Sequence, residues 1–346
     1  MTLSLENLQA RRIDPDKPLL EIDDLVMHYK IKSGEVMAVD NVGFTIHQGE
    51  AVGLVGESGC GKTSTALALL RLLPANAEYI SGEIRLNGED LLQLNDDEMR
   101  QRRWKDIAMV FQGAMNSWNP VYRVGDQIRE VLDTHFRGEM DIDEQNEHIK
   151  TLFAAVGLPP EMADRFPHEF SGGMRQRAVI AMALACSPEL IIADEPTTAL
   201  DVIVQDQILK ELKRIQAELG MSILYISHDI AVIAEVTDSL GVMYAGKLVE
   251  YGPTSEVFAK PRHPYAYLLL RSTPSITGPR RQLAPLEGEP PDLVNPPSGC
   301  RFHPRCPFAT EQCVVEEPPL EEISGGHRVA CWNYEQVPEL DVELVR

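Results

Sequence analysis

Residues 56–63 have the composition and spacing of a loop that binds phosphate. They read Gly-Glu-Ser-Gly-Cys-Gly-Lys-Thr and fit the pattern G-x-x-x-x-G-K-[ST], between an apolar run AVGLV and a helical run TSTALALLRLL. Glycines let several backbone N–H groups converge on one phosphate, and a helix N-terminus adds partial positive charge. The spacing therefore predicts a nucleoside triphosphate site formed by Gly56, Glu57, Ser58, Gly59, Cys60, Gly61, Lys62, Thr63 and Ser64.

Three side chains of this loop are each expected to have a separate chemical role. Lys62 is expected to reach the β- and γ-phosphates, and the hydroxyl of Thr63 to bind Mg²⁺. Cys60 is expected to carry a thiol that is open to modification. The alternative is a glycine-rich turn with a surface lysine, which the strand before and the helix after the loop disfavour.

A second group of chemical residues follows the apolar run LIIAD. Asp194 ends this run and is suited to hold Mg²⁺ through its water shell. Glu195 comes next, where a carboxylate can polarise the attacking water, so we expect it to be the general base. His228, just after the run SILYIS, is a candidate donor to the γ-phosphate. The alternatives are an exposed acid at a strand end and a structural histidine.

The elements that must position these residues alternate along the chain. Short apolar runs and longer helical patterns predict an α/β domain over residues 19–270, preceded by a polar lead-in over 1–18. Helical periodicity replaces the strand signal over about 113–185, which predicts an inserted helical subdomain. A proline-rich linker over 271–299 leads to a small extension with four cysteines over 300–346.

Composition and charge indicate the cellular location of the chain and the classes of ligand that it disfavours. The net charge of −21 disfavours binding to nucleic acid. No apolar run approaches the roughly 18 residues of a membrane span, and the N-terminus lacks the features of a secretory signal. We therefore expect a soluble, cytosolic protein.

The stretch Ser171-Gly172-Gly173-Met174-Arg175-Gln176-Arg177 resembles the signature motif of ATP-binding cassette (ABC) proteins. Together with the loop and the acidic pair, it implies an ABC-type P-loop nucleotide-binding domain that hydrolyses ATP. The resemblance makes Tyr29 the aromatic residue that stacks on adenine. It makes Gln112 a sensor of Mg²⁺ and γ-phosphate, so that Thr63, Gln112 and Asp194 together serve Mg²⁺.

The same resemblance implies that two chains complete each site. Ser171, Gly172 and Gly173 would contact the γ-phosphate of ATP bound to the opposite subunit, at a helix N-terminus. Asp201 matches the loop that crosses the seam of the dimer; without the family it is a helix cap.

Three further stretches are similar to ATPase subunits of dipeptide and oligopeptide importers, namely residues 111–120, 243–247 and 261–265. This similarity implies two separate permease subunits, an extracytoplasmic solute-binding protein that acts indirectly, and a location on the cytoplasmic face of the membrane. It also implies a second, similar ATPase subunit in a heterodimer, with a homodimer as the alternative. In residues 113–120, Met115 and Trp118 suit a permease contact or a structural role. The alternatives are a soluble ABC ATPase unconnected with transport, and a module that binds nucleotide without hydrolysing it.

The C-terminal cysteines have no paired C-x-x-C zinc spacing. They are Cys300, Cys306, Cys313 and Cys331. By resemblance to the extension of the same importer subfamily, they would ligate a [4Fe-4S] cluster. Zn²⁺ and free thiols are the alternatives.

Overall fold

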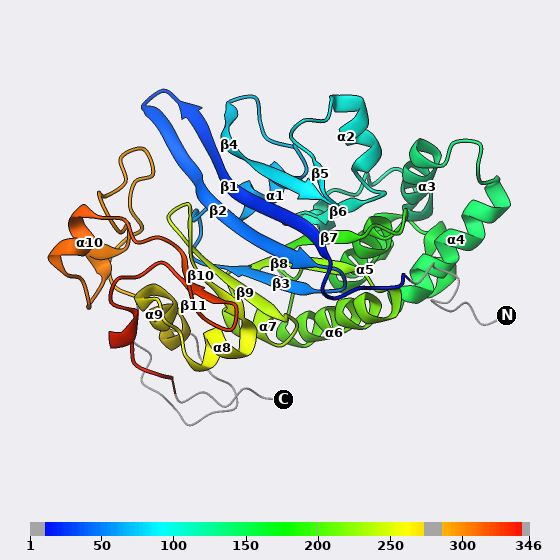
Figure 1. The fold of residues 1–346 in the computed structure, drawn as a ribbon. Helices are drawn as coiled ribbons and strands as arrows, with labels where there is room; N and C mark the ends of the chain where they lie inside the picture. The colour runs from blue at the N-terminus through cyan, green and yellow to red at the C-terminus, as the bar shows by residue number, and fades with distance from the viewer. Residues whose placement is uncertain (1–10, 199, 273–285, 341–346) are drawn as a thin grey trace. The chain divides into compact units, whose positions relative to one another are not determined.

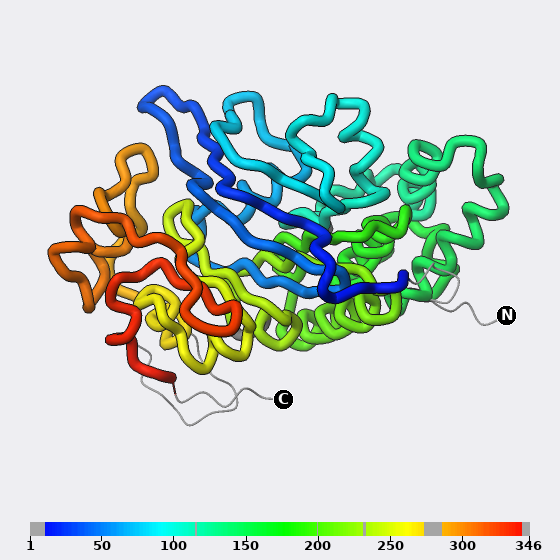
Figure 2. The backbone as a smooth tube through the Cα atoms, in the orientation of Figure 1, coloured from blue at the N-terminus to red at the C-terminus, as the bar shows by residue number. Residues whose placement is uncertain are grey.

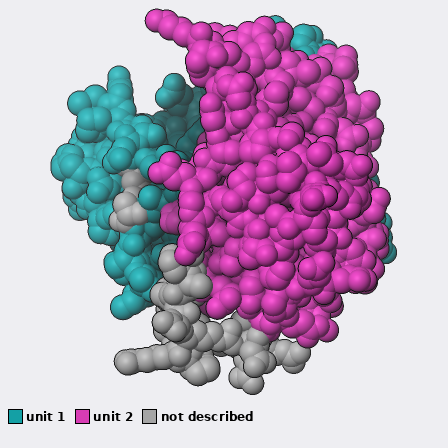
Figure 3. Space-filling view, turned by 90° about the vertical axis from the view of Figure 1, so that its left-hand side faces the viewer, with its two compact units in different colours: residues 1–17, 47–50, 94–224 teal, residues 18–46, 51–93, 225–346 magenta. Residues whose placement is uncertain are grey.

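The computed structural model describes residues 11–198, 200–272 and 286–340, with most of the lead-in and half of the linker outside these ranges. The chain forms two compact units, coloured separately in Figure 3. Unit 1 consists of Met1–Lys17, His47–Glu50 and Leu94–Leu224. Unit 2 consists of Pro18–Ile46, Ala51–Gln93 and Tyr225–Arg346. Each unit is described separately below.

Unit 2 contains a four-stranded sheet in the order β2-β1-β4-β5. Its strands are β1 (Pro18–Ile31), β2 (Gly34–His47), β4 (Ala77–Leu86) and β5 (Glu89–Asp90). β1 runs antiparallel to β4, with Leu20 opposite Leu86 and Tyr29 opposite Ala77. Alternating burial along β2 shows that one face of this sheet packs on the core, as is common for antiparallel sheets.

The other strands of unit 2 follow the order β11-β12-β10-β9-β3. Figure 1 labels β11, β10, β9 and β3, and Figure 2 traces the same backbone as a tube. They are β3 (Ala51–Val55), β9 (Ser239–Tyr244), β10 (Lys247–Pro253), β11 (Glu321–Ser324) and β12 (His327–Val329). β3 is buried along its whole length and pairs in parallel with β9, as its continuous apolar sequence predicts. The helices are α1 (Lys62–Leu69), α7 (Ile230–Ala234), α8 (Thr254–Ala259), α9 (Pro264–Ser272) and α10 (Glu311–Val315), with 3-10 turns η5 (His303–Arg305) and η6 (Tyr334–Gln336).

One buried carboxylate joins the C-terminal extension to the rest of unit 2. Glu250 on β10 is fully buried and accepts hydrogen bonds from the backbone N–H groups of Arg262 and His263, both at 2.8 Å. Its Oε1 lies 2.7 Å from Nε2 of His327 on β12, the neighbouring strand. The carboxylate is therefore satisfied on several sides, as a buried charge requires.

Unit 1 contains a parallel pair of short buried strands, β6 (Ile107–Val110) and β7 (Leu190–Asp194), with Ile107 opposite Leu190. Between these strands, all described residues form helices, turns or loops. The helices of unit 1 are α2 (Asp96–Arg102), α3 (Val124–His135), α4 (Ile142–Ala155), α5 (Gly172–Ala183) and α6 (Val202–Leu219), with 3-10 turns η2 (Ala114–Asn116), η3 (Pro160–Asp164) and η4 (Pro167–Glu169). β8 (Ser222–Ser227) begins in unit 1 and ends in unit 2.

The helices of unit 1 form because their apolar residues recur at helical spacing. α3 buries Val124, Ile128 and Leu132. Asp141 starts α4 with a reciprocal capping box to Glu144. In the described part of the chain, no helix combines the length and the apolar content that crossing a bilayer would demand.

Candidate functional site: a phosphate loop, an acidic strand end and a helix N-terminus

The predicted phosphate loop connects β3 to α1 in unit 2, and two of its glycines are required by sterics. A Cβ on Gly56 (φ 152°) would lie 2.2 Å from the carbonyl oxygen of Met243. A Cβ on Gly61 (φ 108°) would lie 2.2 Å from the carbonyl oxygen of Ala38. Any side chain at either position would displace backbone, so the tight curl of the loop depends on glycine.

The ammonium group of Lys62 lies inside this curl. Its Nζ donates to the carbonyl oxygens of Gly56 at 2.8 Å and Glu57 at 3.0 Å, and the side chain is buried. Ser58 and Gly59, at the tip of the loop, are exposed. A single positive charge is thus held where the backbone of the loop turns around it, which suits the binding of phosphate.

Cys60 contradicts the expectation of an accessible thiol. The residue is buried, and burial raises the pKa of its thiol although Lys62 opposes this shift. A buried, protonated thiol is a poor nucleophile, so the expected modification is wrong for this structure. Cys60 instead packs as a small apolar residue beneath the loop.

Tyr29 lies next to the start of α1. Its hydroxyl donates to Oγ of Ser64 at 3.1 Å, and the residue is half-buried on β1. Thr63, one residue earlier, is exposed. The structure therefore brings together the predicted aromatic residue and the predicted phosphate loop. His228 also belongs to unit 2, is exposed, and follows β8 immediately.

The acidic pair lies at the carboxyl end of β7 in unit 1. Asp194 is buried, and Glu195 adopts a left-handed backbone conformation with φ 46°. Oε2 of Glu195 accepts hydrogen bonds from Nε2 of Gln112 and from Oγ1 of Thr198, both at 2.8 Å. The adjacent parallel strands β6 and β7 explain this meeting, because Gln112 and Glu195 both follow the carboxyl ends of their strands. Thr198 was missed by sequence reasoning, and its only signal is its position three residues after Glu195.

The N-terminus of α5 presents the Ser-Gly-Gly turn. Ser171 is the N-cap of the helix, and its side chain accepts a hydrogen bond from the N–H of Met174 at 3.3 Å. Asp201 caps α6 in the same way, accepting from the N–H of Val204 at 3.0 Å. A Cβ on Gly173 would lie 2.7 Å from the Val204 side chain, so the two helix starts are in close contact. Ser171, Gly173 and Asp201 thus form one surface feature of unit 1.

The four C-terminal cysteines line one small cavity of about 10 Å³, together with Phe302, Phe308, Trp332 and other residues. The N–H of Cys300 donates to the carbonyl oxygen of Cys313 at 2.9 Å, which brings two distant parts of the extension together. Burial raises the pKa of the Cys306 thiol to about 11 and that of the Cys331 thiol to about 12. None of the six cysteines forms a disulfide.

The arrangement of these cysteines does not by itself define a metal site. Among the described residues, no group of three or more His, Cys, Asp or Glu side chains is placed to hold a metal ion. Asn333 donates to sulfur twice, through its backbone to Cys331 at 3.4 Å and through its amide to Cys313 at 3.5 Å. The four cysteines share the lining of one cavity, and the cluster stays a prediction.

Comparison with known proteins gives similarity over most of the chain. Residues 39–198 match the family described as ABC transporter, and residues 249–313 match the C-terminal region of oligopeptide/dipeptide transporters. The oligopeptide transport ATP-binding protein OppD of Bacillus subtilis is 44% identical over 316 residues, covering 91% of this chain and 88% of that protein. The dipeptide transport ATP-binding protein DppD of the same organism is 43% identical, covering 93% of this chain and 96% of that protein.

The fold is also similar to that of solved ATP-binding cassettes. A dimeric cassette in a post-hydrolysis state, bound to ADP and Pi, superposes with a TM-score of 0.61 at 27% identity. The match covers 68% of this chain and 98% of the cassette.

Proposed function

This chain belongs to the family of ATP-binding subunits of oligopeptide and dipeptide ABC transporters, and we propose that it energises peptide uptake through the residues described above. The ABC-type α/β fold and the ATPase activity expected from the sequence are thereby confirmed. The observation that carries the proposal is the hydrogen bond from Gln112 to Glu195, the residue that directly follows Asp194. The division into an ATPase domain (19–270), a linker (271–299) and an extension (300–346) is part of the proposal.

The chemistry follows from the nature of each side chain. Lys62 binds the β- and γ-phosphates, and Thr63 and Asp194, with Gln112, would hold Mg²⁺, which neutralises phosphate charge. Glu195 accepts a proton from the attacking water. The amide of Gln112 and the hydroxyl of Thr198 orient its carboxylate, because both donate to Oε2. His228 donates to the γ-phosphate, and Tyr29 stacks on the adenine.

A second ATPase subunit completes each site in this proposal. The surface beside Asp201 supports it, because Val202 and Ile203 are 69% and 71% exposed at the start of α6. Packing of these two side chains on a partner would remove their apolar surface from water. We propose a heterodimer with a similar subunit, in which Ser171 and Gly173 bind the γ-phosphate held by the opposite chain.

The dimer acts on two permease subunits at the cytoplasmic face of the membrane, and a solute-binding protein delivers the peptide. Trp118 is buried, so it has a structural role, whereas Val121 and Tyr122 are exposed and suit the permease contact. ATP-driven closure must shift the assembly between two states. A nearly complete shift needs about 5.5 kcal/mol of differential binding, which a few charge-assisted phosphate contacts supply.

The cross-subunit site is tested by replacing Ser171 with alanine. The variant loses one hydrogen bond to phosphate, so we expect about tenfold slower ATP turnover by the reconstituted transporter. ATP affinity of the isolated chain should not change, because Ser171 acts on the nucleotide of the partner. Phosphate release and equilibrium ATP binding measure the two effects. Equal turnover in the variant and the wild type would contradict the sandwich, and weaker binding by the isolated chain would place Ser171 in its own site.

We further propose that the four cysteines of the extension hold a [4Fe-4S] cluster, with Zn²⁺ as the alternative. The proposal rests on four cysteines around one cavity in a segment with little core of its own. When bound, the group supplies folding energy to this segment.

Anaerobically purified protein is therefore expected to contain iron and sulfide and to absorb visible light. Replacement of Cys313 with serine should remove most of the iron, sulfide and colour. Replacement of Cys186, a buried cysteine of unit 1, is the matched control and should remove none. Zinc without colour would favour the alternative, and thiols without metal would contradict both.

A further inference from the structure

The C-terminal extension contacts the phosphate loop through one ion pair. Nη1 of Arg305 lies 2.8 Å from Oε2 of Glu57, and Nη2 lies 3.1 Å from Oε1. The Arg305 side chain is only 5% exposed and that of Glu57 is 26% exposed. This two-point geometry fixes the carboxylate in direction as well as in distance.

Both residues of this pair make further contacts that fix their positions. Nε of Arg305 donates to the carbonyl oxygen of Glu287 at 2.9 Å, and its guanidinium lies over the rings of Tyr244 and Phe302. The backbone N–H of Glu57 donates to the hydroxyl of Tyr265 at 2.8 Å. Arg305 is thus fixed in place before it meets Glu57, so little rotamer freedom is lost in holding the pair.

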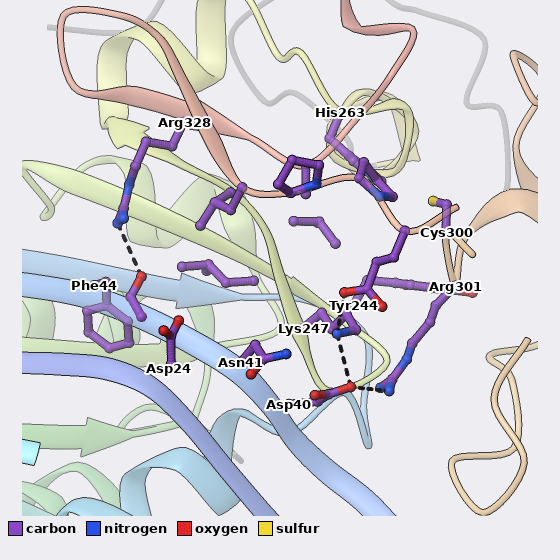
Figure 4. A pocket seen from close by; sticks show the side chains of 18 of the residues that line it. Asp24, Asp40, Asn41, Phe44, Tyr244, Lys247, His263, Cys300, Arg301 and Arg328 are labelled. Atoms are coloured by element: carbon purple, nitrogen blue, oxygen red, sulfur yellow. Dashed lines mark hydrogen bonds and ion pairs between the residues drawn. The ribbon is translucent and has the colours of Figure 1, made fainter. Parts of the chain in front are cut away.

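A second contact of the extension supports the same loop. Arg301 donates to the carbonyl oxygen of Ala245 and pairs with Asp40, which also lies 3.0 Å from Nζ of Lys247 (Figure 4). Asp40, Lys247 and Arg301 border a cavity of about 590 Å³. Gly246, which follows Ala245 in the chain, donates its N–H to the carbonyl oxygen of Cys60 at 2.9 Å. The extension therefore contacts the loop directly at Glu57, and it is linked to Cys60 only through the turn at Ala245 and Gly246.

Glu57 creates an electrostatic problem for a phosphate site, because an unpaired carboxylate in this loop repels a triphosphate. Arg305 removes that problem in two ways. Its positive charge compensates the carboxylate, and its fork geometry holds the carboxylate against the extension. Without Arg305, the carboxylate would be free to turn toward the phosphates.

We propose that Arg305 is a positioning residue for ATP binding, acting on the nucleotide through Glu57, so that the C-terminal extension is a working part of the ATP site. The proposal rests on the function proposed above for the phosphate loop. Loss of Arg305 should weaken ATP binding only while Glu57 keeps its negative charge.

The test is a double-mutant cycle read by equilibrium binding of a fluorescent ATP analogue to the full chain. Arg305→Gln should weaken binding about tenfold, which corresponds to about 1.4 kcal/mol. Glu57→Gln removes the negative charge and leaves the positive charge of Arg305 beside the loop, so it should bind the analogue more tightly than the wild type. The double variant should recover to within about threefold of the wild type, whereas a merely structural loss would add to the second substitution.

Arg328→Gln is the matched control, since Arg328 belongs to the same extension but donates to the carbonyl oxygen of Gly43 and lies over Tyr251. It should bind within about twofold of the wild type. Arg305→Lys keeps the charge but loses the fork, so we expect weakening of about threefold. This variant and Glu57→Gln carry the test if Arg305→Gln does not fold.

Wild-type affinity in Arg305→Gln, no recovery in the double variant, or weakened binding in Glu57→Gln would each overturn the inference. Failure of the proposed function gives a different result. In that case the wild type itself would not bind the analogue, and substitution of Lys62 would change nothing.

Discussion

Replacement of Glu195 with glutamine is expected to slow ATP hydrolysis by a factor on the order of 10²–10⁴ while leaving ATP binding intact. Glutamine has the same shape, but it cannot accept a proton from water. The carboxylate accepts hydrogen bonds from Gln112 and Thr198, and the amide oxygen of glutamine can accept the same two bonds. The change therefore removes the base and conserves its surroundings.

Two measurements check this expectation: phosphate release by the reconstituted transporter, and equilibrium ATP binding by the same variant. Glu189→Gln is the matched control, because Glu189 directly precedes the other end of β7 and pairs with Arg11. It should hydrolyse ATP at close to the wild-type rate. Hydrolysis by Glu195→Gln within about twofold of the wild type would remove this residue as the base.

Lys62→Met is expected to weaken ATP binding by about 100-fold, or roughly 3 kcal/mol. Methionine retains the length and the apolar stem of the lysine, which is buried in the loop. The change removes the positive charge that lies between the carbonyl oxygens of Gly56 and Glu57. Hydrogen bonds to charged groups are the strongest polar contacts available here, so their loss dominates the effect.

Equilibrium binding of the fluorescent ATP analogue measures this loss, and circular dichroism shows whether the variant is folded. Lys210→Met is the control, since Lys210 is an exposed lysine on α6 that pairs with Asp206. It should bind ATP like the wild type. A folded Lys62→Met protein with nearly normal affinity would show that the loop is not the phosphate site.

The two variants separate the stages of the cycle. Lys62→Met should never close around nucleotide, whereas Glu195→Gln should close and remain closed with ATP bound. Each variant thus tests one group of residues by itself, the phosphate loop or the acidic strand end.

The sequence by itself determined the parts of the site that are local. Glycines at positions 56 and 61, between an apolar run and a helical run, were enough to predict a loop between β3 and α1. Ser171 and Asp201 are N-caps of α5 and α6, and serine and aspartate are residue types that favour this position. Such features depend on sterics and on hydrogen bonds between residues a few positions apart, so the order of residue types specifies them.

Only the tertiary structure decided which distant residues meet. Gln112 and Glu195 are 83 residues apart. Glu195 was predicted from its position after Asp194 and Gln112 from the family resemblance, and neither prediction included their hydrogen bond. Glu57 and Arg305 are 248 residues apart, and nothing in their local sequence predicts that they form an ion pair. The burial of Cys60, which made the expected modification wrong, likewise depends on packing around the loop. Contacts of this kind follow from strand order and from where the extension lies, and no short-range pattern encodes either.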